Sequence, residues 1–434
     1  MPPNLNGALA LGAGRFTAMS KILVEGGARL AGTVRTLGAK NAVLKEIVST
    51  LLAPGRHHLP NVPSILDVEL MARVLEHTGC RVEQGDHELW IVVPEDPRPE
   101  APIELVRQMR ASIVVLGPLL ARCGEARVAL PGGDDLGARP IEWHMHGLEQ
   151  MGASFDLVHG ELVARVDGRF KGTEVELPFP SVGATENLLF AGVLAEGETV
   201  IVNAAREPEI QDLIIQLNEM GANVRGGGTS LVTIEGVESL HPVEHKVVPD
   251  RLEAGTYAVA GAITGGDVTV TGCHPDHLRM ELTKLETAGC VVERGDGWLR
   301  VQGPERPQPI DFATLPYPGF HTDMQPQMVA LLSLATGTSI ITENLYDARY
   351  RYVGELARMG ADISVEAQHA IIRGVERLSG CPVLAPDIRA GAALAIAGLA
   401  ADGTTEIGAV SHIDRGYEDF VGKLSSLGAT IERS

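Results

Sequence analysis

The chain has 434 residues, of which 44% are hydrophobic and 21% are charged, and its formal net charge is −20. This length exceeds one ordinary hydrophobic core and favours two or three domains. The acidic balance argues against a nucleic-acid-binding protein, which needs a basic face. No stretch reaches the roughly 18 apolar residues that a membrane helix requires. An anionic ligand must therefore be held by locally clustered Lys and Arg side chains.

The first 20 residues are typical of a loose extension, because their apolar patch is broken by Gly and Arg and lacks the basic start of a secretory signal. Five cysteines, odd in number and without a CxxC pair, indicate structural thiols in a reducing cytoplasm. His144 and His146 form an HxH pair, but no partner stands at metal-ligand spacing. With no phosphate-binding P-loop and no dinucleotide fingerprint, we expect neither a metal nor a cofactor.

A helix that ends in Gly and leads into a strand recurs six times along the chain. The glycines are 68 to 73 residues apart and suit a left-handed helix C-cap. They are Gly79, Gly152, Gly221, Gly289, Gly360 and Gly428. A second helix, rich in Ala and Gly and apolar nearly all round, precedes each strand–helix pair and is expected to be buried. The sequence therefore predicts six α/β repeats, each with one inner and one outer helix.

Six repeats pack most simply as two domains of three, each a ring of sheets around buried helices, with a cleft between them. We expect domain one to be discontinuous, formed by residues 21–39 plus 249–434. Domain two is expected to span residues 40–248 and to carry a catalytic loop at 130–140. The chain then crosses between domains near residues 36–40 and 246–250.

Residues at the starts of the inner helices indicate the chemistry. A helix N-terminus attracts anions, whereas a basic residue there opposes the helix dipole. The six starts carry Lys40 and Asn41, Arg110, Ser181 to Gly183, Arg251, Asp323 and Arg389. Four basic starts among six favour binding of phosphate and carboxylate groups. Asp323 is either an N-cap or a general base.

Two further loops contribute charge. The glycine-rich stretch LPGGDDLGARPIEWH carries Asp134, Asp135 and Arg139, and HIDRGYE carries Arg415. The glycines let the backbone approach a ligand closely. Arg206, beside Glu207 and Glu209, reads better as part of a structural ion pair.

The motifs GAKNAVLK, MRASIVVLGPLLAR, LPGGDDLGARPIEWH, SVGATEN, NAAREPEI, PGFHTDMQPQ, DIRAGAAL and HIDRGYE, in this order, resemble the UDP-N-acetylglucosamine 1-carboxyvinyltransferase family. The resemblance covers nearly the whole chain from about residue 21. It implies a two-domain inside-out α/β barrel of six repeats, three per domain. It also implies transfer of enolpyruvate from phosphoenolpyruvate (PEP) to the 3′-hydroxyl of UDP-N-acetylglucosamine, with release of phosphate, in the first committed step of peptidoglycan synthesis in the cytoplasm.

The resemblance also assigns roles. Lys40, Arg139 and Arg415 would hold the phosphate and carboxylate of PEP, and Asp323 would take the proton of the sugar hydroxyl. The remaining substrate-binding positions that it implies are Asn41, Arg110, Pro140, Glu142, Trp143, Ser181, Val182, Gly183, Leu345, Arg349 and Arg389.

Asp134 departs from the family pattern, in which most members have Cys. Either side chain can act as the acid that protonates PEP, but a carboxylate is a poor target for the epoxide antibiotic fosfomycin, which alkylates the thiol. To act as an acid near neutral pH, Asp134 needs a raised pKa, from burial or from a neighbour such as Asp135.

Other departures affect the acceptor. Phe179 stands where many members have Lys, and Glu142, Trp143 and His321 replace a commoner Asp, aliphatic residue and Pro. These changes leave open another acceptor, such as UMP; shikimate 3-phosphate is disfavoured by the uridine-type loop. A non-catalytic nucleotide-sugar-binding paralogue is disfavoured by the intact set of Lys40, Asp323 and Arg415.

Overall fold

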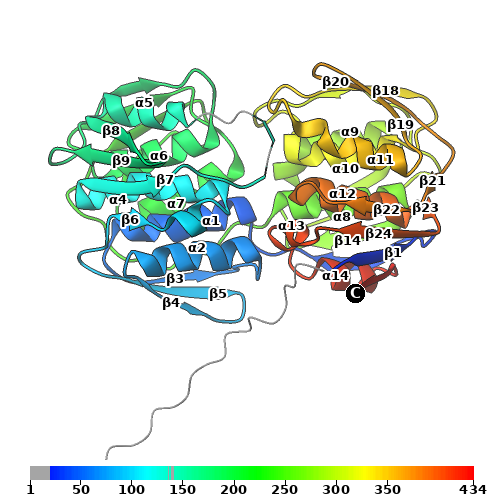
Figure 1. Ribbon diagram of the computed structural model, residues 1–434, viewed down its shortest axis with the longest axis horizontal. Helices are drawn as coiled ribbons and strands as arrows, with labels where there is room; N and C mark the ends of the chain where they lie inside the picture. Colours follow the sequence, from blue (N-terminus) through cyan, green and yellow to red (C-terminus); the bar gives the residue numbers. More distant parts are fainter. Residues whose placement is uncertain (1–19, 135, 138–140) are drawn as a thin grey trace, which may run out of the picture.

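The computed structural model describes residues 20–134, 136–137 and 141–434. Two lobes of similar size lie side by side, and each surrounds its own hydrophobic core (Figure 1). One core runs from Ala39 to Val247. The other combines residues 22–34 with residues 252–431. We call these the continuous lobe and the discontinuous lobe. Among the described residues, no helix is long and apolar enough to cross a membrane.

The continuous lobe alternates strands and helices; η marks a 3-10 helical turn. Its elements are α1 (Lys40–Ser49), η1 (Thr50–Leu52), β3 (Gly55–Pro60), α2 (Leu66–His77), β4 (Arg81–Gln84), β5 (Glu88–Val93), β6 (Glu100–Ala101), α3 (Ile103–Val106), η2 (Arg110–Val115), α4 (Leu116–Cys123), β7 (Glu125–Ala129), α5 (Glu142–Gln150), β8 (Ala153–Val158), β9 (Glu161–Val166), β10 (Glu174–Glu176), α6 (Val182–Val193), β11 (Glu198–Val202), α7 (Pro208–Glu219), β12 (Asn223–Arg225) and β13 (Leu231–Glu235).

The discontinuous lobe takes two strands from the start of the chain and the rest from its second half. Its elements are β1 (Ile22–Glu25), β2 (Ala31–Arg35), α8 (Arg251–Ile263), β14 (Asp267–Thr271), η3 (Pro275–Leu278), α9 (Arg279–Thr287), β15 (Val291–Gly295), β16 (Trp298–Gln302), β17 (Phe312–Ala313), η4 (Thr322–Met324), α10 (Gln325–Leu332), β18 (Thr338–Thr342), η5 (Arg349–Tyr352), α11 (Val353–Arg358), β19 (Asp362–Glu366), β20 (His369–Arg373), β21 (Leu378–Ser379), β22 (Pro382–Leu384), α12 (Ile388–Leu399), β23 (Ala401–Asp402), β24 (Thr404–Gly408), α13 (Ser411–Asp414), α14 (Phe420–Ser426) and β25 (Thr430–Arg433).

Among the described residues, five of the six repeat sheets share one pattern, and the sixth, β3-β5-β4, lacks the short parallel strand. A short strand pairs in parallel with a central strand, which pairs antiparallel with one strand of a hairpin, as in β10-β11-β13-β12 and β17-β18-β20-β19. In β15-β16-β14-β2 the parallel strand is β2, and in β22-β24-β1-β25 the middle of the antiparallel part is β1. The chain start therefore completes two sheets of the discontinuous lobe, and the six repeats predicted from the sequence are confirmed.

The six repeated glycines behave alike. Their φ angles lie between +94° and +107°, the left-handed region that ends a helix at little cost only for Gly. The period read from the sequence is therefore a period of helix C-caps.

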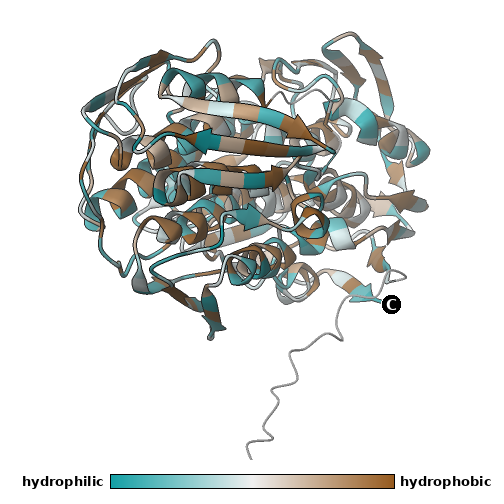
Figure 2. Cartoon of the chain, turned by 60° about the vertical axis from the view of Figure 1, so that its left-hand side comes forward, coloured by the Kyte–Doolittle hydropathy of each residue, from teal (hydrophilic) through white to brown (hydrophobic). Residues whose placement is uncertain are grey.

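The inner helices can be buried on all sides because their own residues are mostly small and apolar, so that neighbouring elements pack closely around them. Every residue of α8 and α12 is buried. Around them, strands such as β14 bury every second side chain, and hydrophobic and hydrophilic residues alternate along the strands in Figure 2. Each lobe is thus a ring of sheets that bury one face against apolar inner helices. The N-termini of these helices carry the polar residues discussed below.

Two antiparallel segments join the lobes. Gly38 bridges Pro249, the amide of Ala39 donates to the carbonyl of Val248 at 2.7 Å, and that of Asp250 donates to Leu37 at 2.8 Å. A side chain at Gly38 would lie 2.0 Å from the carbonyl oxygen of Asn61, so this crossing requires Gly. The exact domain boundaries at residues 39/40 and 248/249 stay a prediction.

Candidate active site

Charged side chains from both lobes meet at the start of α1. Arg415, which follows α13 in the discontinuous lobe, donates from Nε to Oδ1 of Asp67 at 2.8 Å and from Nη1 to Oδ1 of Asp134 at 2.6 Å. Nζ of Lys40 lies 3.0 Å from Oδ2 of Asp67. The Asp67 side chain is fully buried, so one carboxylate holds both cations between the lobes.

The local fold explains why Lys40 and Arg415 are neighbours. The amide of Lys40 donates to Oδ2 of Asp250 at 3.0 Å, which fixes the helix start to the interlobe crossing. Gly416 packs so closely that a Cβ there would lie 2.5 Å from Cγ2 of Ile388 and 3.4 Å from Cδ of Lys40. Burial lowers the pKa of Lys40, and the charge of Asp67 opposes this shift.

Asp134 is ionised in this arrangement. Burial alone would raise the pKa of its carboxyl, but the hydrogen bond with His412 at 3.2 Å and the charges of Arg415 and Lys40 lower it to about 2. The raised pKa that an acid near neutral pH needs is therefore not provided by burial here, because His412 and the cations around the carboxylate outweigh it. Asp135, the other proposed cause, is outside the described residues.

A second charged cluster surrounds Asp323. Nη2 of Arg349 lies 3.2 Å from Oδ1 of Asp323, and Nε of Arg389 lies 3.2 Å from Oδ2. Both guanidinium groups are almost fully buried. Burial would raise the pKa of Asp323, but the two cations hold it far below its usual range. The carboxylate is about one-fifth exposed, so a ligand can reach it.

The N-cap alternative for Asp323 is wrong. His321 caps this turn, with Nδ1 accepting from the amide of Asp323 at 2.9 Å. The carboxylate of Asp323 is thereby left to face Arg349 and Arg389.

The glycine-rich loop lies against the start of η2. A Cβ at Gly132 would lie 1.8 Å from the carbonyl oxygen of Arg107, and one at Gly133, whose φ is +97°, would lie 2.8 Å from the amide nitrogen of Arg110. The glycines therefore bring the backbone before Asp134 against the helix start at Arg110. The close approach to a ligand that the sequence suggests for them stays a prediction.

The same loop contacts the other lobe. The amide of Ala348 donates to the carbonyl of Leu136 at 3.2 Å, while Asp134 pairs with Arg415. The described part of the loop thus spans the two lobes. Two predicted substrate-binding residues of this loop, Arg139 and Pro140, lie outside the described residues.

The predicted uridine-binding positions gather on α5 and α6. Ser181 caps α6, and its hydroxyl accepts from the amide of Ala184 at 3.4 Å. Val182 and Gly183 form the first turn of this helix. A Cβ at Gly183 would lie 2.8 Å from the His144 ring, so the two helices approach closely here.

Aromatic rings flank this helix start. The Trp143 ring stacks on Phe179, with centroids 5.6 Å apart and planes 26° apart. Glu142 opens α5 and is exposed. Phe179 and Trp143 thus form an apolar platform beside the start of α6.

The remaining predicted positions are fixed by local bonds. Leu345 donates its amide to Oε1 of the buried Glu343 at 2.9 Å. Asn41 follows Lys40 in α1, and its carbonyl accepts from Nζ of Lys45 at 2.7 Å.

Arg251 does not belong to an anion-binding site. Its buried guanidinium donates to both oxygens of Glu209, at 2.9 and 3.2 Å. The prediction of an anion ligand at this helix start is therefore wrong, because a carboxylate of α7 already occupies the cation. His144 of the HxH pair has a structural role as well. It is buried, and its Nδ1 lies 2.8 Å from the side-chain nitrogen Nδ2 of Asn187.

Two residues of this site, Asp67 and His412, were not predicted from the sequence. Asp67 lies in the first turn of α2, where an acid is ordinarily explained by the helix dipole. His412 precedes Arg415 by three residues, which places both on one side of the α13 turn. Only the fold shows that Asp67 and His412 face Arg415 and Asp134.

Replacing Asp67 with Asn is expected to destabilise the protein by about 3 kcal/mol, because Lys40 and Arg415 lose their buried counter-ion. Inorganic phosphate should restore more stability in the variant than in the parent, since it can pair with the freed cations. Thermal unfolding with and without phosphate checks this. Asp402→Asn, in an exposed pair with Arg377, is the control and should change stability little. Equal phosphate effects in parent and Asp67→Asn would contradict the account.

The chain matches known proteins over nearly its whole length. A model of the EPSP synthase (3-phosphoshikimate 1-carboxyvinyltransferase) family matches residues 24–424. Among solved structures, the enolpyruvyl transferase NikO from Streptomyces tendae superposes with a TM-score of 0.87 at 25% identity, covering 96% of this chain and 99% of that one. EPSP synthase from Acinetobacter baumannii has the same fold, with a TM-score of 0.73 at 21% identity. The chain therefore belongs to the EPSP synthase family of enolpyruvyl transferases.

Within this family, the chain is similar in sequence to members of one particular group of enzymes. The UDP-N-acetylglucosamine 1-carboxyvinyltransferases of Nocardia farcinica and Mycobacterium tuberculosis are each 52% identical to this chain, over 95% of its length and 98% and 99% of theirs. That of Anaeromyxobacter sp. is also 52% identical, over 96% of this chain. The resemblance read from the motifs is thus confirmed.

Proposed function

We propose that the protein transfers the enolpyruvyl group of PEP to the 3′-hydroxyl of UDP-N-acetylglucosamine and releases phosphate. The observation that carries this is the likeness at 52% identity, over almost all of both chains, to enzymes named for that reaction. The five free cysteines fit a reducing cytoplasm, which we propose as the place of the reaction.

We assign the anions of PEP to the cluster around Lys40. Arg415 and Lys40 are each about one-tenth exposed and come from different lobes. Their present partners are carboxylates, Asp67 and Asp134, which a phosphate group can replace as counter-ion. Arg139 is assigned to the same anions from the family motif alone.

We assign the reacting hydroxyl to Asp323. Its carboxylate is held by two buried guanidinium groups, so it stays ionised and fixed in direction. A fixed, ionised carboxylate can accept the hydroxyl proton once the oxygen attacks an electron-poor carbon. The nucleotide is assigned to Arg110, the start of α6 and the Trp143 platform, where backbone amides and an aromatic face suit a diphosphate and a base.

The chemistry then balances in two stages. Asp134 donates a proton to the methylene carbon of PEP, the sugar oxygen bonds to the adjacent carbon, and the hydroxyl proton passes to Asp323. In the second stage a proton leaves the new methyl group for Asp134 and the double bond re-forms. The C–O bond to phosphate breaks, and the departing phosphate takes up the proton that Asp323 accepted, which restores both carboxyl groups. The cations nearby stabilise charge that moves from PEP to free phosphate.

Asp134 must gain its proton after substrate arrives. The hydrogen bond with His412 and the charges of Arg415 and Lys40 hold the pKa of Asp134 at about 2. A bound phosphate group adds negative charge beside the same cations, which weakens their hold on Asp134 and raises its pKa. Binding of PEP therefore favours the protonated form of Asp134, which then protonates the bound PEP.

Phosphate release tests the proposed function. Purified protein is mixed with PEP and, separately, with UDP-N-acetylglucosamine, UMP or shikimate 3-phosphate. We expect release with UDP-N-acetylglucosamine alone. Release only with UMP would move the protein to another uridine acceptor, and binding without release would make it a non-catalytic paralogue.

Asp134 in place of Cys predicts insensitivity to fosfomycin. A carboxylate is a weak nucleophile toward an epoxide compared with a thiolate, so incubation with the drug should leave activity unchanged. Asp134→Cys should instead lose activity over time, in proportion to the drug concentration. Time-dependent inactivation of the parent protein would contradict this prediction.

A further inference from the structure

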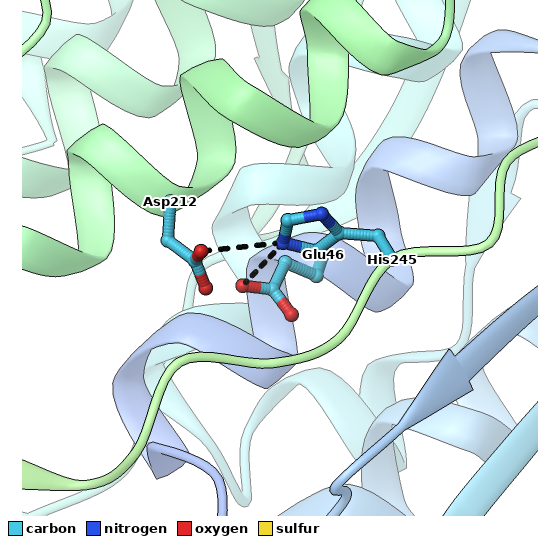
Figure 3. A group of neighbouring side chains, drawn as sticks. All are labelled: Glu46, Asp212 and His245. Atoms are coloured by element: carbon cyan, nitrogen blue, oxygen red, sulfur yellow. Dashed lines mark ion pairs between the residues drawn. The ribbon is translucent and has the colours of Figure 1, made fainter. Parts of the chain in front are cut away.

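A buried cluster of metal-ligating side chains lies in the continuous lobe, outside the site described above. Glu46 of α1, Asp212 of α7 and His245 of the segment leading to the interlobe crossing place one donor atom each within 4.8 Å of the others. Figure 3 shows both carboxylates directed at the same ring nitrogen of His245. This cluster could not be predicted from the sequence, because its members are far apart in the chain and share no motif.

The donor atoms of Glu46 and His245 are buried and lack a hydrogen bond. Glu46 is 0% exposed, and neither of its carboxylate oxygens has a hydrogen-bond partner among the described residues. Nε2 of His245, itself 5% exposed, also lacks one. Burial and the neighbouring Asp212 raise the pKa of Glu46. Burial alone would lower the pKa of His245, but Asp212 and Glu219 raise it, so protons relieve the buried charge in the absence of a metal. A divalent cation among these donor atoms would displace both protons.

Neighbouring groups prepare the histidine as a ligand. Nδ1 of His245 lies 2.7 Å from Oε2 of Glu219, at the end of α7. A carboxylate on one ring nitrogen places the proton there and leaves the lone pair of the other nitrogen directed at Glu46 and Asp212. This carboxylate–histidine–metal relay is the usual outer shell of a zinc-bound histidine. Asp212 is oriented too, because its Oδ2 accepts from the amide of Val248 at 2.8 Å.

Lys45 is adjacent in sequence to Glu46, and its charge partly opposes the rise in the pKa of Glu46. Its Nζ, however, bonds to the carbonyl of Asn41 at 2.7 Å and lies 3.4 Å from Glu186. Lys45 is therefore engaged with other partners than the three ligands.

The spacing fits a small divalent ion. Tetrahedral Zn²⁺ with bonds of about 2.0 Å to N and O separates its ligand atoms by roughly 3.3 Å. Nε2 of His245 lies 3.3 Å from Oδ1 of Asp212 and 3.9 Å from Oε1 of Glu46. A shift of about half an ångström in the Glu46 side chain closes the difference, and a water molecule would complete the tetrahedron, as at other zinc sites with three protein ligands.

We propose that Glu46, Asp212 and His245 bind a structural zinc ion. The ion would join α1, which begins with Lys40, to α7 and to the segment that runs into the crossing at Val248. It would thus hold a cationic helix start of the active site against one of the two connections between the lobes. This proposal does not depend on the substrate that the protein uses.

Metal binding and thermal unfolding of the whole chain test it. Protein stripped with a chelator and dialysed should take up one Zn²⁺ per chain, measured by elemental analysis. Added Zn²⁺ at about 100 times its dissociation constant should raise the unfolding temperature by about 5 °C. Co²⁺ in its place should give the strong visible absorption of a four-coordinate site. Glu46→Gln and His245→Asn should lose all three effects, whereas Glu186→Gln, a buried carboxyl one helix away, should keep them.

Glu46→Gln keeps the side-chain shape and removes a buried charge, so its zinc-free form should be at least as stable as the parent. The proposal is overturned if the parent binds no Zn²⁺ at micromolar concentration. It is equally overturned if uptake or the rise in unfolding temperature persists in Glu46→Gln and His245→Asn, since the metal would then bind elsewhere.

Discussion

Replacing Asp134 with Asn is expected to lower kcat by about 10²- to 10⁴-fold, the range typical of a lost general acid. Asn keeps the size of the side chain and can still contact Arg415 and His412, but it has no proton to give to PEP. The KM for PEP should change far less, because Lys40 and Arg415 remain. Steady-state kinetics with UDP-N-acetylglucosamine as acceptor checks both values.

Asp134→Asn should also change how the free energy of unfolding depends on pH. The pKa of Asp134 falls from 3.8 to about 2 on folding, so its ionised form stabilises the folded protein above pH 4, and this contribution is lost as the pH falls toward 2. At pH 7 we expect Asp134→Asn to be less stable by up to about 2 kcal/mol, and the difference from the parent to vanish near pH 2. Asp134→Cys should recover activity, since a thiol can carry the proton. Near-normal turnover in Asp134→Asn would show that the acid is another group.

Asp323→Asn is expected to reduce kcat by a similar 10²- to 10⁴-fold and also to destabilise the protein by about 3 kcal/mol. The first effect follows from loss of the group that accepts the hydroxyl proton. The second follows because Arg349 and Arg389, both almost fully buried, would lose the carboxylate between them. Kinetics at saturating substrate and thermal unfolding separate the two effects.

Asp387→Asn is the matched control for Asp323. Asp387 is a buried carboxylate that caps α12 beside Arg389, and Asn is an equally good cap. Its activity should stay within a few-fold of the parent. If Asp387→Asn lost as much kcat as Asp323→Asn, general loss of local charge, rather than a base at Asp323, would explain both.

The sequence was sufficient for the repeat architecture because its signals are local. A left-handed residue at a helix end requires Gly, and a helix enclosed by other elements requires small apolar residues. The helix ends at the glycines from Gly79 to Gly428 and the burial of the Ala-rich α12 could therefore be predicted from local sequence. The cationic helix starts at Lys40 and Arg389 could be found for the same reason.

The pairing of charges could not be read in this way. Asp67 and Arg415 are 348 residues apart and meet only when the lobes face each other. The partner of Arg251, Glu209 of α7, is only 42 residues away, but nothing local in the sequence pairs the two, and the internal ion pair occupies what looked like an anion site. The direction of the pKa shift at Asp134 depends on these long-range neighbours, and burial alone suggested the wrong sign.

Proton uptake on PEP binding tests the central claim, that Asp134 is the acid and is protonated only when substrate phosphate joins Lys40 and Arg415. PEP is titrated calorimetrically at pH 7.5, in buffers of different ionisation enthalpy, into protein saturated with an acceptor that lacks the 3′-hydroxyl and so cannot react. At this pH the phosphate of free PEP is largely doubly charged. The account predicts uptake approaching about one proton per PEP in the parent and little in Asp134→Asn. No uptake in the parent, or equal uptake in both proteins, would contradict it.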